Sequence, residues 1–427
     1  MQVIRKWIQA NLHWCFLGLM IFVSFWGFKI IYDSRAISEA DMGYALYYPT
    51  KYAIWIIAGI ITFLALQLFK IPLKKADPTL LVGCAIFFCA LTEIFGCMTC
   101  GAKRFIIFYG VSLNTGHLTE LILILALCVK LYKDYEDGIR DDFFYWLFNI
   151  SVILLLFNLP NRIQVFCIAI VFIIILNLFA KEKRIPRILA WTAISIYALL
   201  FVGISAYGVH LGIANTGIEN VNTGIWFFDS YLPNKINSVL MANPFDDGYQ
   251  QLQSAFCFAD GGLFGAPPQA VSNLTDSLWD GIFPKIGADY GFVGLLGVGG
   301  FFLLFLHFGL QAAMRTKDRM EAILCTSLTL MIEVYAFVGM LTSVGLLFPN
   351  GIGIPFFSYT KLHLIFGWIT AALIFKILRR KDAQTNLIEL PYKKVLVVFM
   401  ILFVIILLKV LYLIVQVSLL TQLQLLK

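Results

Sequence analysis

Charge is scarce in this chain. Asp, Glu, Lys and Arg together make up only 13% of its 427 residues, whereas hydrophobic residues make up 60%. A chain with so little charge is not a typical soluble domain. The sequence also lacks a Walker loop, a dinucleotide-binding fingerprint, an H-E-x-x-H helix and a G-x-S-x-G turn. These absences argue against the common nucleotide-dependent, zinc-protease and serine-hydrolase chemistries.

Long apolar runs are what the chain has in place of charge. A helix of about 20 apolar residues crosses the ~30 Å hydrocarbon core of a bilayer. We therefore predict an all-α polytopic integral membrane protein with about ten transmembrane helices, an eleventh candidate, and a large extracytoplasmic loop between spans seven and eight. The predicted spans are 14–31, 52–72, 79–98, 116–133, 144–158, 163–180, 188–207, 288–313, 322–347 and 359–378, with 395–420 as the eleventh candidate.

The basic residues predict how the chain is oriented. With the N-terminus in the cytoplasm, 21 of the 32 Lys and Arg residues fall in inner segments, as the positive-inside rule requires. The net charge of +7 is then an orientation signal with an affinity for anionic membrane lipid, and needs no nucleic-acid partner. The predicted segments are 1–207 with seven spans, an extracytoplasmic loop at 208–290, spans eight to ten at 291–380, and a cytoplasmic linker with the extra span at 381–427.

The eleventh candidate allows two interpretations. Val395–Leu420 is nearly all apolar and follows Lys393 and Lys394, which favours a span that carries the tail outside. Lys409 divides the run, so two shorter pieces could instead lie along the membrane interface. A span here would be available to pack against the single helix of a partner protein.

Unusual polar segments all fall on the predicted outer side. A carboxylate, a cation or a glycine-rich turn at the outer face of the membrane costs free energy to place there, and it usually has a function. The segments are Gly101–Phe105, Asn114–Glu120, Leu159–Arg162, Gly248–Asp280 with the following Gly287–Gly294, and Asn350–Tyr359.

These segments resemble the SEDS family, the polymerases of the FtsW, RodA and SpoVE type. Gly248-Tyr249-Gln250, Gln253-Ser254 and Gly261–Gly265 are similar to the family's G-Y-Q…Q-S…G-G-L-F-G block. Trp279–Gly294 resembles T-D-F-I-F-A-V-I-G-E-E-x-G-F-V-G, which sets the family's essential aspartate on Asp280. Asn350–Tyr359 resembles T-G-I-P-L-P-F-x-S-Y, and Gly101–Phe105 and Asn114–Glu120 resemble G-A-x-R-W and Q-P-S-E-L-x-K.

The chain departs from the family pattern at several positions. His117 and Glu120 stand where the family has Glu and Lys, and the family's P-D-L-G-T is reduced to Pro160-Asn161-Arg162. Thr275-Asp276 reproduces the family's T-D pair, although only Asp280 has the family spacing to Gly287. We prefer Asp280 as the catalytic aspartate and keep Asp276 as the alternative. A loop or helix N-cap carboxylate is the structural interpretation of either residue.

The resemblance implies an activity. Members of the family are peptidoglycan glycosyltransferases, so it implies that lipid II, a polyprenyl-pyrophosphate-linked sugar donor, is polymerised onto a nascent glycan with inversion, in cell division or cell-shape maintenance. The implied partner is a class B penicillin-binding protein, a transpeptidase. The implied location is the bacterial cytoplasmic membrane, with the active site on the outer face.

The chemistry assigns roles to the outer residues. An acceptor hydroxyl must lose a proton as it attacks, and a carboxylate such as Asp280 can accept it. Cationic side chains or a divalent cation, Mg or Mn, would neutralise the leaving diphosphate. Basic residues at span ends also anchor to lipid headgroups, and His117 and Glu120, three residues apart on one helix face, could instead satisfy each other. The predicted substrate-binding residues are Lys103, Arg104, His117, Glu120, Asn161, Arg162, Gln253, Ser254 and Ser358.

Two other classes of protein share part of this pattern. A lipid-linked sugar polymerase or ligase of the O-antigen type would also have many spans and a large outer loop. It would typically rely on loop arginines, and 208–290 contains none. A flippase for a lipid-linked precursor would need a charged path through the membrane, whereas the polar residues here cluster at one face.

Overall fold

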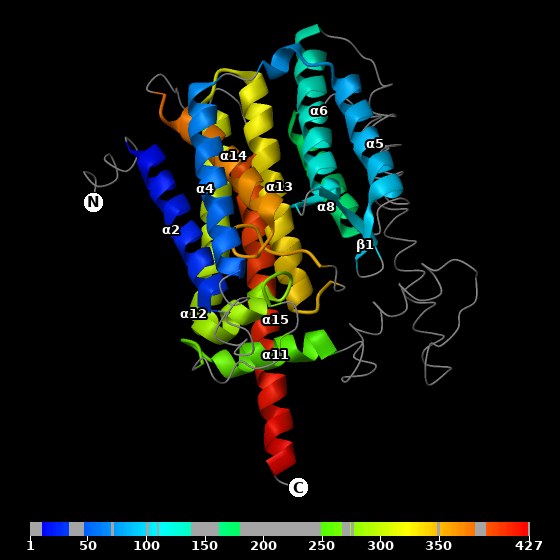
Figure 1. The fold of residues 1–427 in the computed structure, drawn as a ribbon. Coiled ribbons are helices and arrows are strands. Elements are labelled where there is room, and N and C mark those ends of the chain that lie inside the picture. Colours follow the sequence, from blue (N-terminus) through cyan, green and yellow to red (C-terminus); the bar gives the residue numbers. More distant parts are fainter. Residues whose placement is uncertain are drawn as a thin grey trace, which may run out of the picture.

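The computed structural model shows a bundle of long helices (Figure 1). It describes residues 11–33, 47–69, 72–99, 102–108, 111–137, 162–179, 249–266, 274, 277–347, 351–380 and 390–425. Seven of the described helices are long and apolar enough to cross a membrane, which confirms the prediction of a polytopic α-helical membrane protein. Those seven are α2 (Leu12–Asp33), α4 (Tyr47–Leu68), α6 (Thr115–Asp137), α12 (Ile282–Arg315), α13 (Arg319–Ser343), α14 (Lys361–Leu378) and α15 (Tyr392–Leu425).

Two shorter apolar helices match further predicted spans. They are α5 (Pro78–Phe95) and α8 (Arg162–Phe179), which correspond to predicted spans three and six. Predicted spans 144–158 and 188–207 lie outside the described residues, as does most of the predicted loop. Within that loop the structure describes the amphipathic helix α11 (Tyr249–Gly261) and the first residues of α12.

Helix α13 is the centre of the bundle. It packs against α6 and α8 on one side and against α12 and α14 on the other. Over an 18-residue apolar stretch of α13, 94% is buried inside the protein. The close approach of α12 depends on Gly309, because a Cβ at that position would lie 2.2 Å from Thr329 Oγ1 of α13. Small residues of this kind let membrane helices approach each other closely.

A small antiparallel sheet follows α5, and the sequence did not predict it. It consists of β1 (Cys97–Thr99), β2 (Ala102–Phe108) and β3 (Val111–Asn114) in the order β1-β2-β3. Predicted span three therefore ends early: α5 stops at Phe95, and Gly96 caps it in an extended conformation. Phe105 pairs with Asn114, so the sheet connects the predicted Gly101–Phe105 segment directly to the start of α6.

Helix α12 is broken near its beginning. Gly291 has φ 65° and ψ −162°, a backbone conformation that glycine adopts readily and L side chains do not. The amides of Phe292 and Val293 donate to Gly262 O and Leu263 O, at 2.9 and 3.1 Å. Predicted span eight began at 288, but helical structure begins at Ile282, inside the predicted loop. Residues 282–290 thus form a half-helix that is locked to the segment following α11.

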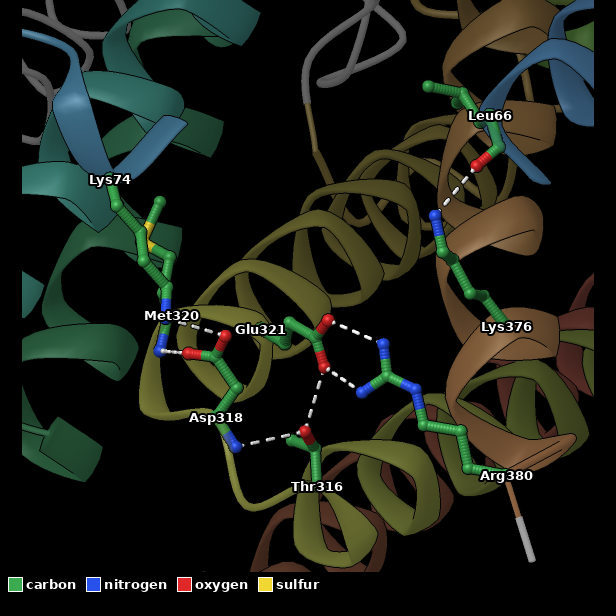
Figure 2. A network of polar contacts seen from close by, with 8 residues as sticks. All are labelled: Leu66, Lys74, Thr316, Asp318, Met320, Glu321, Lys376 and Arg380. Carbon is green, nitrogen blue, oxygen red and sulfur yellow. Dashed lines mark hydrogen bonds and ion pairs between the residues drawn. The ribbon is translucent and has the colours of Figure 1, made fainter. Parts of the chain in front are cut away.

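The bundle has two distinct ends. The half-helix, α11, the sheet and the 351–360 segment lie at one end, which we call the α11 end (Figure 1). At the opposite end, Lys74 Nζ in the turn η2 (Leu73–Lys75) contacts Asp318 Oδ2 at 2.8 Å, and Arg380 donates two bonds to Glu321, at 2.6 and 2.8 Å (Figure 2). These ion pairs raise the pKa of Lys74 and of Arg380. We call Lys74, Thr316, Asp318, Glu321 and Arg380 the η2 clamp.

Helix α15 is one continuous helix through Lys409. An 18-residue stretch within Tyr392–Ser418 has a mean hydropathy of 3.1, and Lys409 Nζ lies 4.8 Å from the centroid of the Tyr412 ring. Figure 1 shows α15 passing beside α11 and projecting beyond it at the C-terminal end. A division into two interfacial pieces does not fit this continuous helix.

Candidate functional site

Asp280 lies in the turn that leads into the half-helix of α12. Its carboxylate accepts a hydrogen bond from Gln250 Nε2 of α11, at 3.1 Å from Oδ2. Ser343 Oγ, in the last turn of α13, donates to the backbone oxygen of Asp280 at 3.4 Å and to Gly339 O at 2.9 Å. Helices α11 and α13, which are distant in the sequence, therefore both bond to Asp280, α11 to its carboxylate and α13 to its backbone oxygen.

The segment before Asp280 is fixed by the 351–360 segment. The amide of Tyr359 donates to Leu278 O at 2.7 Å. The rings of Tyr48, Trp279 and Tyr359 form a cluster of edge contacts, with centroids 5.2 to 6.1 Å apart. Burial raises the pKa of Tyr359 to about 12, so its hydroxyl stays protonated at neutral pH. The aromatic cluster provides a rigid wall beside the candidate site.

The 351–360 segment is itself held in a strained turn. Phe356 has φ 67°, which a bulky residue adopts only when its surroundings require it. The hydroxyl of Tyr52 donates to Phe356 O, and the Phe356 ring packs in the core against Phe301 and Phe305. Ser358, a predicted substrate residue, is fully buried and donates to Ile354 O at 2.8 Å. In this structure Ser358 stabilises the turn.

Helix α11 carries further amides and a hydroxyl close to Gln250. Gln251 Nε2 donates to Thr342 O of α13 at 3.1 Å, which ties α11 to the same end of α13 as Ser343. Ser254 is buried and donates to Gln250 O at 2.8 Å within its own helix. Gln253 is half-buried on α11. Roles of Gln253 and Ser254 in binding substrate stay predictions.

His117 and Glu120 lie in a buried cluster with side chains from α13 and α14. His117 Nδ1 lies 3.2 Å from Glu120 Oε2 and 3.2 Å from His363 Nε2 of α14. The Tyr335 ring of α13 packs against both imidazoles, at 5.8 and 4.6 Å between centroids. The exposed fractions of His117, Glu120 and His363 are 7%, 2% and 1%. These contacts fit the structural interpretation, in which the cluster joins α6, α13 and α14.

The predicted cationic residues are described only in part. Lys103 and Arg104 lie on β2, and Arg162 is the first residue of α8, but their side chains are outside the description. Asn161 and the alternative aspartate Asp276 lie outside the described residues. Their roles stay predictions. Figure 1 shows the sheet that contains β2 at the α11 end of the bundle, and Asp280 lies at the same end because it bonds to Gln250 of α11.

One residue of this site was quoted in a motif but not predicted as functional. Gln250 belongs to the G-Y-Q block, and only its position in space shows that it contacts Asp280. An ion pair on the half-helix was also not predicted from the sequence. Lys285 Nζ lies 2.8 Å from Asp289 Oδ2, and Lys285 is only 2% exposed. Their spacing of four residues was the available signal.

Comparisons with known proteins agree with this fold. A solved structure titled "Structural coordination of polymerization and crosslinking by a peptidoglycan synthase complex" has a chain that matches with a TM-score of 0.62 at 18% identity, over 86% of this chain and 97% of that one. The rod shape determining protein RodA of Thermus thermophilus matches with a TM-score of 0.58 at 16% identity, over 87% and 98% of the two chains. At these identities the likeness shows the fold.

Sequence relatives extend along most of the chain. The probable peptidoglycan glycosyltransferase FtsW of Trichlorobacter lovleyi is 23% identical over 390 residues, which are 88% of this chain and 96% of that protein. The protein of the same name from Borreliella burgdorferi is 26% identical over 282 residues, 64% of this chain and 71% of that protein. The model of the FtsW, RodA and SpoVE family, described as "Cell cycle protein", matches residues 13–383. This chain therefore belongs to the FtsW, RodA and SpoVE family of cell cycle proteins.

Proposed function

We propose that this chain is a peptidoglycan glycosyltransferase that polymerises lipid II into glycan strands, in cell division or cell-shape maintenance. Its family membership and the names of its relatives support this activity. The observation that carries it is the bond from Gln250 to Asp280. This bond joins the two motif blocks that the family shares, and it does so at a carboxylate suited to proton transfer.

The proposed reaction needs little from the protein besides positioning and charge. The donor, a sugar on a polyprenyl diphosphate, already has an activated leaving group. Asp280 accepts the proton from the acceptor hydroxyl as that oxygen attacks the donor's anomeric carbon, with inversion, and the diphosphate departs. Gln250 orients the carboxylate through its amide. Arg104, Lys103 and Arg162 are the proposed sources of positive charge for the departing diphosphate.

A divalent cation, Mg or Mn, stays part of the proposal. Among the described residues, no group of three or more His, Cys, Asp or Glu side chains could hold a metal ion. Mg²⁺ is, however, commonly held by one or two carboxylates together with substrate phosphates, and Asp280 provides one such carboxylate. When bound, the cation would supply positive charge to the diphosphate.

We place the protein in the bacterial cytoplasmic membrane with its N-terminus inside and the α11 end outside. The η2 clamp end carries Lys74, Arg315, Lys376, Arg379 and Arg380, in accordance with the positive-inside rule. Both substrates, lipid II and the nascent glycan, would then meet Asp280 at the outer surface. A class B penicillin-binding protein is the proposed partner, because the matched synthase complex couples polymerization with crosslinking according to its title.

The decisive experiment is a polymerisation assay with the purified full chain and lipid II, with and without the partner. We expect glycan strands on a gel from the wild-type protein and none from Asp280→Asn. A wild-type protein that makes no polymer under either condition would contradict the proposal. Movement of unpolymerised lipid II across vesicles would instead support a flippase, and polymer from an O-antigen-type donor would support that class of polymerase.

A further inference from the structure

Helix α15 packs against the rest of the protein along a regular stripe. Its buried residues follow each other at steps of four, three, four and seven. A repeat of 3.5 residues is the spacing with which one helix seam stays on its neighbours over several turns. Another side of α15 is open: Val398, Ile401, Val404 and Leu408 are 52 to 60% exposed. Apolar residues with this exposure suit a side that faces lipid. The stripe consists of Phe399, Phe403, Ile406, Val410 and Val417.

The stripe fits its neighbours closely. A Cβ at Gly299 of α12 would lie 2.0 Å from Cε2 of Phe403, so the Phe403 ring occupies the place where another residue would carry its side chain. Phe399 makes an edge contact with Phe337 of α13, with centroids 5.0 Å apart. Close packing of an aromatic ring over glycine is a strong way to hold membrane helices together, because lipid offers no hydrophobic driving force between them.

The elements that α15 contacts are those that build the candidate site. It packs against α11, α12 and α13. Helix α11 provides Gln250, α12 begins two residues after Asp280, and α13 provides Ser343. Helix α11 has only 13 residues, and isolated helices of that length are marginal in water. Its position therefore depends on packing, and its described packing partners include α15.

We propose that α15 is an internal brace of the Asp280 site: through Phe403 on Gly299, it holds α11 against α12 and so keeps Gln250 in register with Asp280. Phe403 is then a positioning residue that touches no substrate. Its effect on polymerisation rests on the proposed function, whereas its effect on α11 does not. The brace uses only the buried stripe of α15, so packing of its exposed side against a partner's single helix stays a separate prediction.

A natural thiol reports on α11 without any activity assay. Cys257 lies on α11, is 7% exposed, and packs against Ala288 of the half-helix. Burial raises the pKa of Cys257 to about 12, so it reacts slowly with a maleimide, which attacks through the thiolate. Loosening α11 from α12 exposes this thiol and speeds its labelling. Cys325, fully buried inside α13, reports on loss of the whole fold.

The test measures N-ethylmaleimide labelling of each cysteine by mass spectrometry in the full chain. We expect Phe403→Ala to raise the labelling rate of Cys257 at least about tenfold with Cys325 still protected, and Phe403→Leu to raise it less. Val404→Ala, a change at the adjacent half-exposed position, should leave both rates unchanged. Wild-type protection of Cys257 in both Phe403 variants would overturn the brace. So would a parallel rise at Cys257 and Cys325 in both, because α15 would then stabilise the whole bundle and not α11.

Polymerisation of lipid II then separates the brace from the proposed function. Phe403→Ala should lower kcat more than it raises KM, because it displaces Gln250 from Asp280 without removing a substrate contact. If wild-type protein makes no polymer but Cys257 responds as expected, the brace stands and the function fails. If wild-type protein is active and Phe403→Ala changes neither turnover nor labelling, the function stands and the brace fails.

Discussion

The two ends of the helix bundle are held by different kinds of bond. The η2 clamp consists of ion pairs between side chains, among them the two-bond pair of Arg380 with Glu321 at 2.6 and 2.8 Å. At the α11 end, the described contacts include amide bonds from Gln250 and Gln251, at 3.1 Å each, and the aromatic cluster around Tyr359. Bonds between two charged groups are shorter than bonds from a neutral amide.

This difference distinguishes a fixed end, which is the η2 clamp, from a working end, which is the α11 end where the proposed reaction takes place. The ion pairs of the η2 clamp join the turn before α5, the turn between α12 and α13, and the end of α14, so they hold four helices in place. Amide bonds at the α11 end cost less to exchange for bonds to a substrate. The comparison predicts that changes at the α11 end lower activity, whereas changes at the η2 clamp lower stability.

The largest effect should come from Asp280. Asp280→Asn keeps the size of the side chain and one acceptor oxygen for Gln250, but it removes the ability to accept a proton at neutral pH. We expect polymerisation to fall at least about 100-fold, the contribution typical of a general base, with unchanged abundance in the membrane. Asp260→Asn, at an exposed position of α11, is the control. Full activity of Asp280→Asn together with loss in Asp276→Asn would move the catalytic role to Asp276.

Gln250 should have the next largest effect. Gln250→Ala removes the amide that donates to Asp280, and we expect polymerisation to fall about tenfold, which corresponds to about 1.4 kcal/mol for one bond to a charged group. Gln251→Ala, which removes a bond to the backbone of α13, should cost less. Equal losses in the two variants would show that α11 acts as a whole and that Gln250 has no special part in orienting the carboxylate.

Arg104 tests how far the working end extends along the sheet. Arg104→Ala should lower polymerisation about fivefold, and Arg104→Lys should lower it less, because lysine keeps the charge but loses the two-pronged contact with a diphosphate. Steady-state rates at several lipid II concentrations would measure both variants. Wild-type turnover in both would leave lipid anchoring as the role of Arg104.

The smallest effect on activity should come from the η2 clamp. Glu321→Gln breaks the pair with Arg380, whose side chain is 45% exposed. We expect a loss of about 1 kcal/mol in the free energy of unfolding, near the upper value for exposed pairs, and a lower thermal midpoint. Turnover per folded molecule should be unchanged. Arg379→Gln is the control for charge at this end. A fall in turnover equal to that of Gln250→Ala would contradict the division between the two ends.

Much of the fold could be predicted from hydrophobic runs, whereas motif order indicated only the segments in which the candidate site lies. Long apolar segments such as those of α12 and α13 have one dominant solution in a membrane, namely a helix. The sheet at Cys97–Asn114 was missed because its apolar residues continue the pattern of α5. The break at Gly291 was missed because its bonds come from Gly262 and Leu263, on another segment.

The side-chain partners were the least predictable part. His117 and Glu120 share a helix face and could be paired from their spacing, but His363 comes from a helix 246 positions away. The same holds for the bond between Gln250 and Asp280, because each motif alone gives no distance to the other. Contacts of this kind depend on how helices assemble, which local sequence does not specify.

The position of α15 along the chain has a consequence for biosynthesis. A ribosome makes the motif blocks around Gln250, Asp280 and Tyr359 before it makes Tyr392–Leu425, which packs beside α11. A nascent chain that has reached residue 380 thus contains every segment that resembles a family motif and still lacks the helix that we infer holds α11 in place. The working end would be completed last, after membrane insertion of the final described helix, so that a truncated translation product carries the motifs without an assembled site.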